Sequence, residues 1–115
     1  MKRVLIFITA VFFAITASAQ MPKGYEVKTE RLAKNLVKCS KQGKYNKTYK
    51  ALRNIQRYEY RLTKEQLFVF YDDIHSEVYK ACNEYGLDET GKAEMKVIID
   101  ALFSDELKNE VNRQN

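Results

Sequence analysis

The chain has 115 residues, which is enough for one small domain but too few for two domains that each bury a core. Leu, Ile, Val and Tyr are plentiful after residue 20, and this composition argues against a disordered protein. The formal net charge is only +5, so any electrostatic argument about partners must rest on where the charges lie.

The first 19 residues have the pattern of a cleavable secretory signal. Lys2 and Arg3 precede an apolar run at 4–15, and residues 17–19 (Ala-Ser-Ala) supply the small side chains that signal peptidase requires. Cleavage is therefore predicted just before Gln20. The apolar run of about 12 residues is shorter than the roughly 20 that a spanning helix needs, and no later segment approaches that length. We expect a secreted or periplasmic protein without integral membrane insertion.

Both cysteines, Cys39 and Cys82, lie after the predicted cleavage site. An exported chain folds in an oxidising compartment, where an even pair of cysteines predicts one intramolecular disulfide. Closing a loop of roughly 40 residues would stabilise the fold by about 4 kcal/mol. The alternatives are two free thiols or an intermolecular bridge. Neither cysteine has a His or Cys neighbour at ligand spacing, so no zinc site is predicted.

The hydrophobic spacing predicts two helices in the first half of the mature chain. Apolar residues recur every three or four positions over 27–42, and Gly43 suits the left-handed position that follows a helix end. A second helix is predicted over 45–62. Its apolar face is expected to consist of Tyr45, Tyr49, Leu52, Ile55 and Leu62.

Two further helices are predicted in the second half. Thr63 and Gln66 form a capping box that starts a third helix, and Gly86 ends it. A fourth helix, capped by Asp88 or Thr90, continues through Phe103. Residues 104–106 either start a final turn or let this helix run on to 111.

The predicted fold class is all-α: a small four-helix up-down bundle with one intramolecular disulfide, after a cleaved signal peptide. Short loops between helices of this length favour antiparallel neighbours, so the first and third helices run parallel and bring Cys39 and Cys82 to the same end. The predicted organisation is a signal peptide at 1–19, a flexible mature N-terminus at 20–26, one helical domain at 27–111 and a frayed tail at 112–115.

Charge is divided unevenly along the chain. Residues 20–64 carry thirteen Lys or Arg against three Glu, whereas residues 65–115 carry five Lys or Arg against twelve Asp or Glu. At about 100° per residue, five cations in and just after the second predicted helix fall within about 80° of arc, opposite Leu52 and Ile55. This predicted basic stripe consists of Lys50, Arg53, Arg57, Arg61 and Lys64.

Three interpretations of the basic stripe are open. It is a solvated face partly neutralised by the acidic second half, an interface that attracts an acidic partner protein, or a site for a polyanion such as nucleic acid, lipopolysaccharide or a sulfated glycan. Tyr58 and Tyr60 flank the stripe and could stack on bases or sugars. No motif of a nucleic-acid-binding fold accompanies them.

No catalytic residues, metal site or cofactor are predicted. His75 is the only histidine, and Asp72 can share a helix face with it, but a second pair of ligands at matching spacing is missing. Ser76 is adjacent to His75, and adjacent side chains on a helix do not face each other, so no Ser-His-acid triad is encoded locally. The mature glycines are isolated, so no phosphate-binding loop is present.

The function that these observations favour is a non-enzymatic protein-binding or inhibitor-type module that uses the basic stripe against an acidic partner. The first alternative is a polyanion-binding protein. The second is a carrier of an apolar ligand, because Phe68, Val69 and Phe70 widen the apolar face of the third predicted helix.

Overall fold

The computed structural model describes residues 20–114, so the predicted signal peptide lies outside the described residues. The described part of the chain is all-helical, with five α-helices and no strand. Among the described helices, none combines the length and the apolar character needed to span a membrane. The five helices are α2 (Tyr25–Lys41), α3 (Tyr45–Glu59), α4 (Lys64–Glu84), α5 (Glu89–Asp100) and α6 (Asp105–Gln114).

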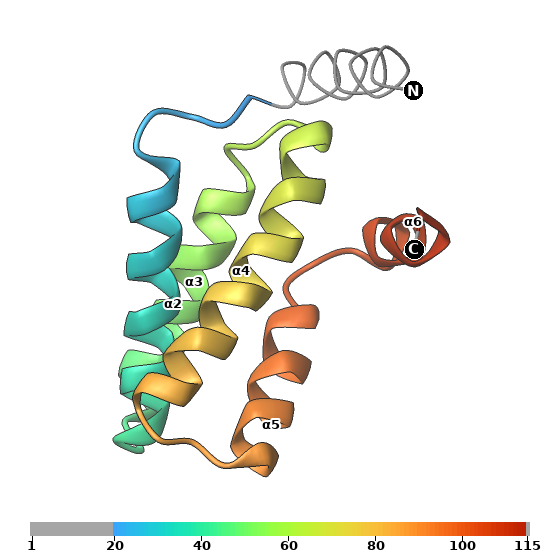
Figure 1. Cartoon of the computed structure of the whole chain (residues 1–115). Helices are drawn as coiled ribbons and strands as arrows, with labels where there is room; N and C mark the ends of the chain where they lie inside the picture. Colours follow the sequence, from blue (N-terminus) through green and yellow to red (C-terminus); the bar gives the residue numbers. More distant parts are fainter. Residues whose placement is uncertain (1–19, 115) are drawn as a thin grey trace, which may run out of the picture.

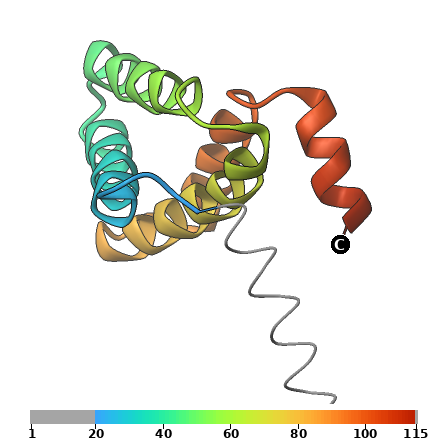
Figure 2. The same cartoon turned by 90° about the horizontal axis from the view of Figure 1, so that it is seen from above.

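The first four of these helices run alternately up and down, side by side, as Figure 1 shows. Helix α2 packs against both α3 and α4, and α5 packs against α4. Helix α6 turns away from this direction and projects to the side of α4 and α5 in both views (Figures 1 and 2). The predicted helical bundle is therefore present, with one helix more than the sequence prediction counted.

Local turn chemistry explains where several of the helices begin and end. Gly43 and Gly86 have φ angles of 69° and 75°, the left-handed conformation that glycine adopts without a Cβ penalty. At the start of α4, the backbone N–H of Gln66 donates to Thr63 Oγ1 at 3.2 Å, and the N–H of Thr63 donates to Gln66 Oε1 at 2.9 Å. Asp88 caps α5 by accepting from the N–H of Gly91 at 2.8 Å. These predicted caps are confirmed.

Replacing Thr63 with alanine should remove the capping box and lower the free energy of unfolding by about 1 kcal/mol. Thr48 provides the matched control, because its hydroxyl donates to the carbonyl of Lys44, the residue before α3, and satisfies no orphan amide. Thr48→Ala should be neutral or slightly stabilising. Urea unfolding of both variants measures the difference, and equal midpoints for the two would contradict a capping role for Thr63.

Several predicted helix boundaries differ from those of the structure. Helix α3 ends at Glu59 and not at residue 62, and the fourth predicted helix ends at Asp100. A new helix then begins because the Ser104 hydroxyl accepts from the N–H of Leu107 at 3.1 Å, which caps α6. Residues 112–114, predicted as frayed, belong to α6.

The segment before α2 is also tied to the domain. Helix α2 starts at Tyr25, two residues earlier than predicted. Met21 packs partly buried against the core, and Gln66 Nε2 donates to the Gln20 carbonyl at 2.7 Å. The N-terminal part of the predicted flexible segment thus contacts the start of α4.

One continuous hydrophobic core joins all five helices. Phe70 of α4 is fully buried at its centre, with the rings of Tyr25, Tyr58 and Phe103 at centroid distances of 6.2, 5.4 and 6.0 Å. Edge-to-face and tilted aromatic contacts of this kind add to the energy of burial. This cluster connects α2, α3 and α4 to the loop that precedes α6.

The predicted disulfide is absent from this structure, in which Cys39 and Cys82 are both free and buried. The two cysteines do lie near the same end of the bundle, because the Lys41 ammonium donates to the Tyr85 carbonyl across α2 and α4. Cys39 lies outside the core cluster, and its thiol donates to Asn35 Oδ1, one turn earlier on α2, at 3.7 Å. Cys82 belongs to the core cluster and lies beneath the groove between α4 and α5. The two thiols therefore have different surroundings although they lie near the same end of the bundle.

Candidate interaction surface

Helix α3 has a buried face and an exposed face that differ from the prediction. The buried residues are Ala51, Ile55 and Tyr58. Tyr45 and Tyr49, predicted to be buried, are 88% and 62% exposed. The apolar stripe actually used passes through Ala51, a small residue that the sequence pattern did not rank beside two tyrosines, and this shifts the core-facing direction away from them.

All five residues of the predicted basic stripe are exposed, but they do not form one straight line. Lys50, Arg53 and Arg57 lie on α3, on the side away from its buried face. Arg61 lies in the turn after the end of α3, and Lys64 is the first residue of α4. Because α3 ends at Glu59, the helical phase used to align Arg61 and Lys64 with the others does not hold. Lys64 instead borders a small groove at the α6 end of the molecule.

None of the ion pairs formed among residues 20–114 involves Lys50, Arg53 or Arg57. The one acidic residue of α3 is Glu59, and one of its carboxylate oxygens is buried without a hydrogen-bond partner. Burial raises the pKa of Glu59 to about 7. This carboxyl group therefore contributes less negative charge than an exposed one near neutral pH, and the cations of α3 are not neutralised by their own helix.

Exposed tyrosines lie beside these cations. The guanidinium carbon of Arg53 is 5.9 Å from the centroid of the Tyr49 ring, a cation–π arrangement at the surface. Tyr60, the C-terminal cap residue of α3, is 76% exposed. The surface formed by Tyr45, Tyr49, Lys50, Arg53 and Arg57 is called the α3 surface below.

His75 lies in a hydrogen-bonded cluster between α4 and α5 that the sequence did not predict. Its Nε2 is 2.7 Å from Asp100 Oδ1, and its Nδ1 is 2.7 Å from the Tyr71 carbonyl oxygen. The Tyr71 hydroxyl donates to the same Asp100 oxygen at 2.9 Å. Asp100 is 25 residues from His75, so no local spacing could have indicated the pair. Burial, followed by this hydrogen bond, raises the pKa of Tyr71 to about 12.

This cluster holds the two helices together and leaves His75 without a free nitrogen. Each ring nitrogen is within hydrogen-bond distance of an oxygen atom of a neighbouring residue. Neither nitrogen is therefore free to accept a hydrogen bond from Ser76. Asp73 is engaged elsewhere, where its carboxylate accepts from the Tyr25 hydroxyl at 2.6 Å. Across the described residues, no three His, Cys, Asp or Glu side chains converge on a position that could hold a metal ion.

The apolar residues that suggested a carrier belong largely to the interior. Phe70 is fully buried, and Phe68 is partly buried against the same core cluster. Val69 is intermediate in exposure. These three residues therefore do not line a common ligand cavity.

Comparison of the chain with protein-family models, with curated proteins and with solved structures gives no match. The class that the fold defines is a small all-helical bundle. Any function must accordingly be argued from the α3 surface and the other features of this molecule.

Proposed function

We propose that this protein is an exported, non-enzymatic binding module whose α3 surface docks on an acidic patch of a partner protein. The observation that carries the proposal is a face of one helix with exposed tyrosines and with exposed cations that form no ion pair within residues 20–114. The export component rests on the signal pattern of residues 1–19. An inhibitor that works by occupying its target fits this description.

The charge distribution supports an acidic partner. Cations that already have ion-pair partners lose those contacts on binding, whereas Lys50, Arg53 and Arg57 have none to lose among the described residues. Complementary charge steers the encounter of two proteins and disfavours wrong partners. The acidic residues of the second half that form ion pairs within residues 20–114 do so with other cations, and none of them pairs with a cation of the α3 surface.

The tyrosines favour a protein interface over a merely solvated face. Tyr and Arg are the residues most enriched at the energetic centres of protein interfaces, because both offer large contact area together with hydrogen bonds. The ring of Tyr45 is 88% exposed, and a helix face that contacts only water gains no stability from such a ring. The position of Tyr49 against Arg53 also restrains the guanidinium before binding, which lowers the entropy lost on docking.

The test is affinity capture from cell-envelope and culture extracts with the protein and with a variant that carries Lys50→Glu, Arg53→Glu and Arg57→Glu. We expect one stoichiometric partner that the variant binds at least about tenfold more weakly. The matched control carries Lys23→Glu, Lys28→Glu and Lys38→Glu. These three lysines are exposed, form no ion pair among residues 20–114, and change the net charge by the same amount.

The control separates a local surface from total charge. If the α3 variant loses the partner and the control variant keeps it, the α3 surface is the docking site. If both variants weaken equally and the captured material is nucleic acid, lipopolysaccharide or glycan released by salt, the protein binds polyanions and the docking proposal is wrong.

A further inference from the structure

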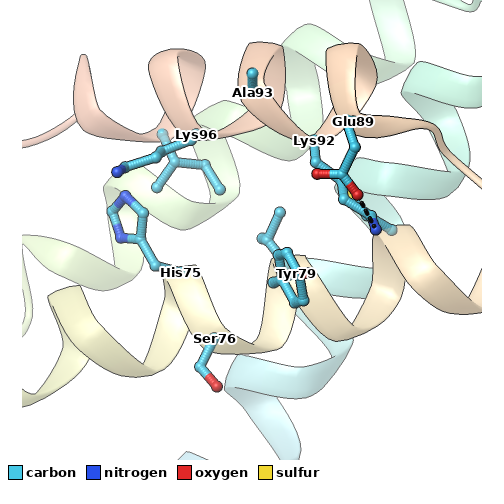
Figure 3. A pocket seen from close by; sticks show the side chains of 10 residues that line it. His75, Ser76, Tyr79, Glu89, Lys92, Ala93 and Lys96 are labelled. Atoms are coloured by element: carbon cyan, nitrogen blue, oxygen red, sulfur yellow. Dashed lines mark hydrogen bonds and ion pairs between the residues drawn. The ribbon is translucent and has the colours of Figure 1, made fainter.

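A groove runs between α4 and α5, on residues separate from the α3 surface. Its volume is about 420 Å³, within the range of small-molecule sites. Figure 3 shows its walls, with His75, Ser76 and Tyr79 on one helix and Glu89, Lys92, Ala93 and Lys96 on the other. Because the two helices are antiparallel, Lys96 lies at the His75 end and Lys92 lies toward the Tyr79 end.

The floor of the groove is apolar. Val78 is 3% exposed, and Cys82 and Ile99 are fully buried beneath it. Burial raises the pKa of the Cys82 thiol, so this side chain stays neutral. A ligand in the groove therefore contacts aliphatic groups and an uncharged thiol along its length.

The polar groups at the two ends of the groove are not equivalent. At one end, the Lys92 ammonium is 3.1 Å from Glu89 and lies 4.9 Å from the centroid of the Tyr79 ring, so its charge is compensated. At the other end, Lys96 forms no ion pair with any described residue. Asp100, four residues after Lys96, accepts hydrogen bonds from Tyr71 and His75 at one carboxylate oxygen and forms no ion pair with Lys96. Among the basic residues that line the groove, Lys96 is therefore the one without an ion-pair partner in residues 20–114.

We propose that the α4–α5 groove binds a small carboxylate with a short apolar tail, the carboxylate pairing with Lys96 and the tail lying over Val78, Cys82 and Ile99. The size follows from the helix spacing. Lys92 and Lys96 are four residues apart, which is about 6 Å along the axis, and His75 to Cys82 spans about 10 Å. A phenyl ring or a chain of a few carbons fits this length, and a long acyl chain exceeds it.

The experiment is an NMR titration of the protein with 3-phenylpropionate, compared with 3-phenylpropylamine, which has the same tail and the opposite charge. We expect the carboxylate to shift amide signals of residues 75–82 and 92–99 and to bind at least about tenfold more tightly than the amine. Equal binding of the acid and the amine, or shifts that map outside α4 and α5, would overturn the proposal.

Two variants and a control locate the site. Lys96→Ala should weaken binding of the carboxylate by about tenfold, because it removes the charge-assisted contact. Ala93→Trp should abolish binding, since Ala93 lines the groove and a large ring there fills it. Glu94→Trp, on an exposed residue of α5 outside this groove, should bind as the parent does. If Ala93→Trp does not fold, Lys96→Ala decides alone, and unchanged affinity in it contradicts the proposed site.

Discussion

Replacing Phe70 with alanine is expected to lower the free energy of unfolding by about 3–5 kcal/mol. Phe70 is fully buried and contacts the rings of Tyr25, Tyr58 and Phe103. Removal of its ring loses the burial energy and leaves a cavity bounded by other aromatic rings, which cannot collapse into it without moving their helices. A domain of this size has a total stability of about 5–15 kcal/mol, so much of the population should unfold at modest denaturant concentrations.

Urea unfolding followed by far-ultraviolet circular dichroism measures this loss, with Phe68→Ala as the matched control. Phe68 lies on the same helix and is only partly buried, so its truncation should cost about 1 kcal/mol. If the two variants have the same unfolding free energy, Phe70 is not at the centre of the core. A large change for Phe70→Ala in the slope of the unfolding free energy against urea concentration would instead indicate that the compactness of the native or the denatured state has changed.

Features that depend on a few neighbouring residues could be predicted from the sequence. The capping box of Thr63 and Gln66, the Asp88 cap, and the left-handed glycines at 43 and 86 are each satisfied within a few residues of the chain. The long apolar periodicity of α4 was also predicted, because buried residues such as Ile74 and Val78 repeat over several turns. These local patterns do not depend on how the other helices are arranged.

Features that depend on how helices are rotated against one another could not be predicted. Helix α3 buries the face with Ala51 and Tyr58 and exposes the face with Tyr45 and Tyr49. The fit to the neighbouring helices decides which face is buried, and residue hydrophobicity alone does not. The predicted disulfide depended in the same way on how two helices place side chains at one level of the bundle, which the spacing of the cysteines in the sequence does not decide.

The candidate sites also combine local features, which the sequence predicts, with features set by helix packing, which it does not. The concentration of cations at 50–57 was visible in the sequence, but the exposed tyrosines beside them followed only from the rotation of α3. The groove between α4 and α5 and the pairing of His75 with Asp100 bring together residues more than 20 positions apart. Tertiary packing alone creates these features. The sequence therefore predicted the cations of the α3 surface but not its exposed tyrosines.

Glu59 gives the protein an expected dependence of stability on pH. Burial raises the pKa of its carboxyl group from 4.5 to about 7 in the folded protein. As the pH rises above about 4.5, the unfolded chain therefore loses this proton before the folded protein does. The folded state then binds more protons than the unfolded state, and under that condition the free energy of unfolding falls with rising pH until about pH 7. The carboxylate also lies in the last turn of α3, where the helix dipole disfavours negative charge.

Glu59→Gln should remove this dependence, because the amide carries no charge at any pH. The variant and the parent should have similar unfolding free energies at pH 4.5, whereas at pH 8 the variant should be more stable by about 1–2 kcal/mol. This value is smaller than the full shift implies, because Glu59 is only half-buried and solvent screens part of the effect. Glu94→Gln, at an exposed position of α5, should follow the parent at both pH values. Urea unfolding at the two pH values gives the comparison, and a Glu59→Gln variant that also follows the parent would show that the folded protein ionises this carboxyl group without cost.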